Sequence, residues 1–111
     1  MNPQTASDAE VDAWLAEHCP EAYEALYKKE GVINGEWHPT QDYDQLTLCE
    51  AKVKDRCYMH FQWSPILNQW CADTTLLPSQ SEEEIKNNSE LSARARLVVA
   101  ILQFEQEAER G

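Results

Sequence analysis

The spacing of apolar residues near the start of the chain predicts two consecutive helices. After Ser7-Asp8, such residues recur at intervals of three and four positions, at Val11, Trp14, Leu15 and His18. This spacing is typical of an amphipathic helix with a Ser or Asp N-cap. Pro20 interrupts the pattern, but proline suits a first helical position, so a second helix is expected over Pro20–Glu30. Its buried or partner face would consist of Ala22, Tyr23, Leu26 and Tyr27, and Gly31 would end it.

The middle of the chain contains two signals that the sequence leaves open. Asn34-Gly35 lies between apolar residues and is compatible with a tight hairpin or with a loop. Farther on, apolar spacing favours a helix over Asp42–Lys54, with Asp42 or Thr40 as its N-cap. A strand over Leu46–Cys49 is the weaker alternative.

Alternation of side chains gives the clearest strand signal. Cys57, Met59, Phe61 and Trp63 would lie on one face of a strand, with Tyr58, His60 and Gln62 on the other. Ser64–Asn68 is turn-like, and Gln69–Thr74 is expected to return as a second strand. The sequence therefore predicts an antiparallel hairpin at about residues 56–75.

A long apolar stripe near the end of the chain predicts a final helix. The polar and acidic segment Leu76–Asn88 is expected to be a loop or a short helical turn. Ser89 is expected to cap a helix that runs to Glu109 and buries Leu91, Ala95, Val98, Val99 and Leu102. A second apolar set widens this stripe beyond what one sheet face needs: Leu97, Ile101 and Phe104. The surplus of apolar surface favours a homodimer through the helix. Together, these elements predict one α+β domain over residues 1–111, in which a small antiparallel sheet packs with N-terminal helices and a long C-terminal helix.

Composition and charge describe a globular, strongly acidic chain. Hydrophobic residues make up 42% and charged residues 26%, which excludes wholesale disorder. The net charge of −11 opposes direct binding to nucleic acid or to an anionic membrane. There is no apolar run long enough to span a membrane and no pattern of a secretory signal, so we expect a cytoplasmic protein. Its four cysteines are then expected to be reduced, rather than paired in two disulfides: Cys19, Cys49, Cys57 and Cys71.

Residue patterns that carry chemistry give no support for an enzyme. Cys57 and His60 would point to opposite faces of a strand, and no Cys-x-x-Cys pair exists, so no metal site is expected. The negative field of the chain disfavours a thiolate at Cys19, beside His18. Three glycines cannot form a phosphate-binding loop, and Glu82-Glu83-Glu84 is most simply a solvated acidic loop. We therefore expect no catalytic residue, no bound metal and no cofactor.

Three segments along the chain resemble those of a known family. The first is Asp8–Glu17, the second is Trp37-His38-Pro39 followed by Asp42-Tyr43-Asp44, and the third is the hairpin with Trp70 followed by Leu91–Leu102. They resemble the opening helix, the Pro-x-x-Ser-x-Asp helix entry and the terminal Ala-rich helix of the phage ABA-sandwich domain family. The family's usual Ser is Asp42 here, and bulkier residues replace its alanines. The resemblance implies a small α+β sandwich and a phage or prophage origin, and it brings no activity or catalytic residue.

The acidic N-terminal half suggests how such a protein would act. Residues 1–55 hold 12 acidic and 4 basic residues, whereas residues 56–111 hold 8 and 5. We predict a non-enzymatic, DNA-mimic-like inhibitor of anti-CRISPR or anti-restriction type, which occupies the basic surface of a host nucleic-acid-binding defence complex. The predicted partner-binding residues are Asp8, Asp12, Glu17, Glu21 and Glu24. An ordinary solvated helix surface would have the same composition. The alternative function is a phage accessory protein that acts as a homodimeric structural or interaction module, in which exposed Trp and Tyr side chains suit a protein-binding face.

Overall fold

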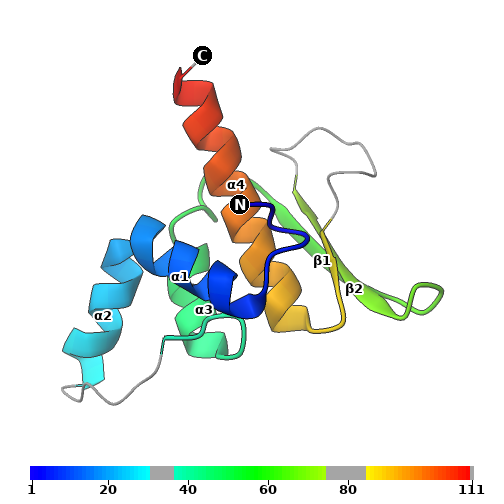
Figure 1. Ribbon diagram of the computed structural model, residues 1–111, viewed down its shortest axis with the longest axis horizontal. Helices are drawn as coiled ribbons and strands as arrows, with labels where there is room; N and C mark the ends of the chain where they lie inside the picture. Colours follow the sequence, from blue (N-terminus) through cyan, green and yellow to red (C-terminus); the bar gives the residue numbers. More distant parts are fainter. Residues whose placement is uncertain (31–36, 75–84, 111) are drawn as a thin grey trace.

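Four helices and a three-stranded antiparallel sheet make up the part of the chain that the computed structural model describes, residues 1–30, 37–74 and 85–110 (Figure 1). The helices are α1 (Asp8–His18), α2 (Pro20–Glu30), α3 (Tyr43–Glu50) and α4 (Glu90–Arg110). The strands are β1 (Met59–Ser64), β2 (Gln69–Thr74) and β3 (Ile85–Asn87). The expected α+β class, with N-terminal helices and a long C-terminal helix, is confirmed.

Short-range hydrogen bonds explain where the helices begin. Ser7 Oγ accepts from Glu10 N at 3.2 Å, and Glu10 Oε1 accepts from Ser7 N at 3.2 Å, which forms a capping box at the start of α1. At α3, Asp42 Oδ1 accepts from Gln45 N at 3.1 Å, so Asp42 is the cap. The expected helix over Asp42–Lys54 is shorter than predicted, because α3 ends at Glu50 and turns follow it. The alternative of a strand over Leu46–Cys49 is wrong.

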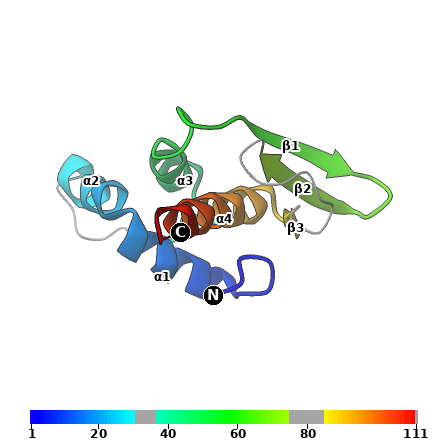
Figure 2. The ribbon, with the colours of Figure 1, turned by 90° about the horizontal axis from the view of Figure 1, so that it is seen from above.

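The predicted hairpin is present with an unbroken register. All six residues of β1 pair with β2, from Met59 opposite Thr74 to Ser64 opposite Gln69. Near the tip, Trp63 lies opposite Trp70, and their rings meet edge to face with centroids 5.7 Å apart. Asn68, whose φ is 55°, supplies the left-handed conformation of the turn. In both Figure 1 and Figure 2, this turn extends away from the helices.

A third strand corrects the prediction of a loop or helical turn over Leu76–Asn88. β3 pairs antiparallel with β2, with Ile85 opposite Ala72, and Ile85 packs into the core. Three residues are too short a run to display the alternation by which a strand is recognised in sequence. Residues 76–84 lie outside the described part of the chain, as do Gly31 and the Asn34-Gly35 signal.

Helix α4 lies at the centre of the fold. Figure 2 shows it between α1 and α3, and it also contacts β2 and β3. Because neighbours surround it, the second apolar set is covered within the chain: Leu97 and Ile101 are fully buried, and Phe104 packs partly buried against the core. The unsatisfied apolar stripe that favoured a homodimer through this helix is therefore not present. None of the described helices is long and apolar enough to cross a membrane.

Candidate interaction surfaces

The predicted row of carboxylates is interrupted at Asp12, which is buried. Its Oδ1 accepts from Thr40 N at 3.0 Å, and its Oδ2 accepts from Thr40 Oγ1 at 3.1 Å. Burial raises the pKa of the Asp12 carboxyl, and the hydrogen bonds from Thr40 oppose part of this shift. Asp12 thus fastens α1 to the segment before α3 and does not present its charge to a partner.

Asp8 is also engaged within the chain. Its Oδ1 accepts from Arg96 Nη2 at 2.9 Å and from Ser92 Oγ at 2.7 Å, both on α4. The Arg96 side chain is buried, and it donates further to the backbone carbonyls of Pro3 and Ala6. Arg96 therefore compensates the Asp8 charge and holds the N-terminal segment against α4.

The other three predicted residues present their carboxylates at the surface of α1 and α2. Glu17, Glu21 and Glu24 are all exposed. Glu21 lies 3.1 Å from Lys52 Nζ, and the pKa of its carboxyl is lowered, first by its own backbone N–H and then by Lys52. The acidic surface, defined from here on as Glu17, Glu21 and Glu24, is what remains of the predicted row.

A second surface is notable for carrying no formal charge. None of residues 57–72, which form β1, the turn and most of β2, is Asp, Glu, Lys or Arg, although such residues make up 26% of the chain. Several of its large apolar side chains are exposed: Ile66 is 94% exposed, Tyr58 67%, Leu67 48% and Trp63 43%. Aromatic enrichment and charge depletion distinguish the cores of protein–protein interfaces from ordinary surface. Sequence alternation predicted this hairpin but could not show which of its aromatic residues remain exposed.

Arg94 of α4 contacts the middle of strand β1 and the end of α3. It donates to Glu50 Oε1 at 2.7 Å and to Oε2 at 3.0 Å, and its guanidinium lies 4.8 Å from the centre of the Phe61 ring. The hydrogen bonds that Arg94 donates to the Glu50 carboxylate raise the pKa of Arg94, so this guanidinium remains charged. The contact joins α3, α4 and β1, beside the packing of β2 and β3 on α4.

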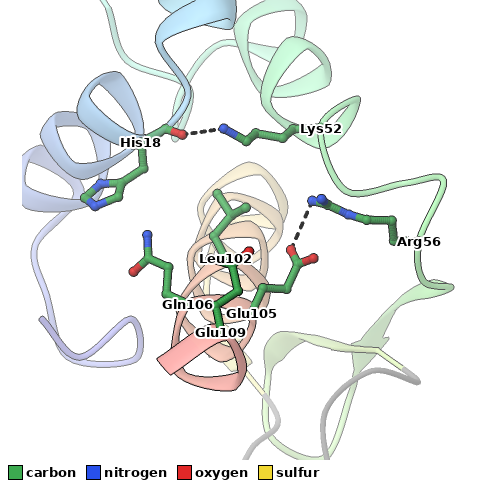
Figure 3. Close-up of a pocket in the computed structure, with 7 residues that line it drawn as sticks. All are labelled: His18, Lys52, Arg56, Leu102, Glu105, Gln106 and Glu109. Carbon is green, nitrogen blue, oxygen red and sulfur yellow. Dashed lines mark hydrogen bonds and ion pairs between the residues drawn. The ribbon is translucent and has the colours of Figure 1, made fainter. Parts of the chain in front are cut away.

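A shallow pocket of about 190 Å³ opens between the end of α4, the end of α1 and the turns after α3 (Figure 3). Its two cationic side chains already have partners. Lys52 Nζ donates to His18 O at 2.7 Å, and Arg56 Nη2 lies 3.0 Å from Glu105 Oε1. The pocket is smaller than the clefts that hold most small-molecule ligands, and its polar groups are used to join the elements around it.

The cysteines are free thiols in the described structure. Cys19 and Cys49 are buried and hydrogen-bond to each other, which lowers the pKa of Cys19 and raises that of Cys49. The lowered pKa differs from the expectation drawn from net charge, because a local hydrogen bond outweighs the distant field. Among the described residues, no group of three or more His, Cys, Asp or Glu side chains is arranged to hold a metal ion.

Comparison with known proteins gives no match. No family model matches the sequence, and no curated protein or solved structure shows significant similarity to it. The resemblance to the phage ABA-sandwich domain family stays a prediction, and the function is argued from the two surfaces alone.

Proposed function

We propose that the chain is a cytoplasmic, non-enzymatic binding protein that docks on a protein partner with a basic surface. The observation that carries this proposal is an exposed, uncharged hairpin tip, formed by Ile66 and Leu67, on a chain whose net charge is −11. The tip would supply the apolar contact, and the acidic surface would select and orient the partner.

The hairpin tip has the properties of an interface anchor. Ile66 and Leu67 extend from a rigid two-stranded base, and the Trp63–Trp70 pair stiffens the strands directly behind them. Exposed apolar groups that are held in place lose little conformational entropy on binding. More of the free energy gained by burying them therefore contributes to affinity. Burial of such a tip in an apolar recess of a partner is therefore more favourable than its exposure to water.

Charge indicates the kind of partner. A chain with this net charge is drawn toward a basic protein surface and repelled by nucleic acid and anionic membranes. Basic surfaces that normally bind nucleic acid are the strongest candidates, because the exposed carboxylates of Glu17, Glu21 and Glu24 can compete there with phosphates. Inhibition of a host defence complex by a phage or prophage protein is one form of this function. In that form, Asp12 is buried and does not act as an exposed charge, and the charge of the partly exposed Asp8 is compensated by Arg96.

Matched charge reversals test this proposal. The partner is captured from a lysate of the native host, purified, and titrated with the wild-type chain and with two triple variants. One variant carries Glu17→Lys, Glu21→Lys and Glu24→Lys; the control carries Asp55→Lys, Glu107→Lys and Glu109→Lys, which are also exposed and change net charge equally. We expect the first variant alone to lose at least about tenfold in affinity, and wild-type binding to weaken with added salt.

Substitution at the hairpin tip tests the apolar contact separately. Ile66→Ser with Leu67→Ser should weaken binding of the same purified partner without changing the melting temperature, because both side chains are exposed. Equal affinity of all three variants and the wild type would overturn the proposed function.

A further inference from the structure

The two edges of the sheet differ in how their backbone groups are satisfied. The strand order is β1-β2-β3, so β1 and β3 are the edge strands of the described sheet. At β3, the side chain of Gln4 acts as a substitute for a neighbouring strand: its Oε1 accepts from Lys86 N at 2.9 Å, and its Nε2 donates to Lys86 O at 2.7 Å. This edge is also short and carries a lysine, which are two further ways in which proteins block an edge.

Within the described part of the chain, the outer edge of β1 lacks this protection. Among the described residues, none outside the sheet hydrogen-bonds to the backbone of Met59–Ser64. Figure 2 shows β1 at the side of the sheet that faces away from β3, with no described helix beyond it. A strand of six residues in unbroken register leaves alternate N–H and C=O groups directed outward along this edge.

The composition of β1 also leaves the edge open. The strand contains no proline, lysine, arginine or carboxylate, and its register shows no bulge. These are the features by which natural proteins prevent one edge strand from pairing with another. Their absence from β1, beside a β3 edge that has a lysine and the contact with Gln4, leaves the β1 edge available for pairing.

The local absence of charge allows a second copy of the chain to occupy this edge, in spite of the net charge. Two chains that each carry −11 repel wherever their carboxylates meet. The uncharged stretch at residues 57–72 is a surface on which two copies can approach without opposing carboxylates. Antiparallel pairing through a twofold axis is also self-complementary, as the commonest dimers are.

We propose that β1 pairs antiparallel with β1 of a second copy, which joins the two sheets into one. A twofold axis perpendicular to the sheet requires residues of the same face to lie opposite each other. In the register centred on Phe61, Met59 lies opposite Trp63 of the partner copy and His60 opposite Gln62. The two hairpin tips then lie at opposite ends of the joined sheet, so the dimer presents two tips and two acidic surfaces.

Light scattering over a concentration series tests the pairing with two matched variants. His60→Lys with Gln62→Lys places lysines in the edge, where they face each other across the axis; both positions are exposed, so the fold should persist. Gln41→Lys with Ala13→Lys makes the same charge change at exposed positions away from the hairpin. The wild type and the control should show twice the 12.8 kDa chain mass at micromolar concentration. The edge variant should dissociate with a constant at least about tenfold higher.

Two further readouts locate the contact. Amide hydrogen exchange in Met59–Ser64 should slow as wild-type concentration rises, because outward N–H groups become hydrogen-bonded. Added salt should strengthen the dimer by screening the repulsion between two acidic chains, whereas it should weaken binding to a basic partner. A 12.8 kDa particle at every concentration, or a dimer that the edge lysines leave unchanged, would overturn the pairing. A monomer that still binds its partner through the tip would overturn the pairing alone and leave the proposed function standing.

Discussion

Arg94 and Glu50, which are 44 residues apart in the sequence, form a two-point ion pair that is largely hidden from solvent. The pair joins α4 to the end of α3, and Arg94 also covers the Phe61 ring of β1. Neither side chain could be assigned to the other from the sequence, because nothing in their local pattern marks them as partners. This contact adds to the packing of β2 and β3 against α4, which joins the sheet to the helices.

Removal of one member of this pair should destabilise the protein severely. Glu50→Ala leaves the largely buried Arg94 guanidinium with only the more exposed carboxylate of Glu90, at 3.6 Å, and the loss of the buried partner from such a pair costs about 3–5 kcal/mol. The exposed pair of Lys52 and Glu21 provides the control: Glu21→Ala should change the free energy of unfolding by less than about 1 kcal/mol. Urea denaturation measures both values, and similar values for the two variants would show that the Arg94–Glu50 pair is not effectively buried.

A charge in the buried face of α4 should unfold the domain. Val98 is completely buried, and an unpaired carboxylate at this position in Val98→Asp costs several kcal/mol, comparable with a whole stability of about 5–15 kcal/mol. Ala108→Asp places the same side chain on the exposed end of the helix and should leave the melting temperature within a few degrees of wild type. Circular dichroism melts distinguish the two, and equal melting temperatures would contradict the central position of α4.

The four thiols should differ sharply in their accessibility. In denaturant, all four should react with iodoacetamide, because they are free. In the native protein, the half-buried Cys57 should react first, and the three buried cysteines should react slowly. Although the pKa of Cys19 is lowered, burial should limit its reaction. Mass spectrometry of a labelling time course identifies the order, and rapid labelling of Cys19 would contradict its burial.

Local patterns in the sequence are sufficient to predict most of the helices and strands. They are not sufficient to predict which charged side chains have partners within the chain. The Ser7 cap and the hairpin depend on neighbouring residues, so both were predicted correctly. The sequence predicts Asp8 and Asp12 as surface charges, yet Asp12 stands one position from Val11 and three from Leu15, on the same buried stripe of the helix. That spacing was the available signal that Asp12 faces inward.

Long-range partners account for what the sequence could not show. Asp12 is bound by Thr40, and Asp8 is bound by Arg96. β3 is recognisable only through its pairing with β2 and the contact of Lys86 with Gln4. Of the predicted binding residues, the sequence therefore identified Glu17, Glu21 and Glu24 as exposed carboxylates, while the open edge of β1 became evident only in the assembled sheet.

Replacement of the buried Asp12 by asparagine should change how stability depends on pH. Burial raises the folded-state pKa of this carboxyl above its ordinary value of 3.8, so the folded protein binds a proton more tightly than the unfolded chain does. The contribution of Asp12 to stability is thus fully present below pH 3.8 and decreases as the pH rises through the raised pKa. Asp12→Asn cannot lose a proton, and its amide can still bond to Thr40.

Relative to wild type, the variant should therefore gain stability as the pH rises. Urea denaturation of both proteins at a series of pH values measures this difference, and subtracting the two curves cancels the opposite contribution of carboxyls with lowered pKa, such as Glu21. A difference that stays constant with pH, or that moves in favour of the wild type as the pH rises, would show that hydrogen bonds from Thr40 outweigh the effect of burial.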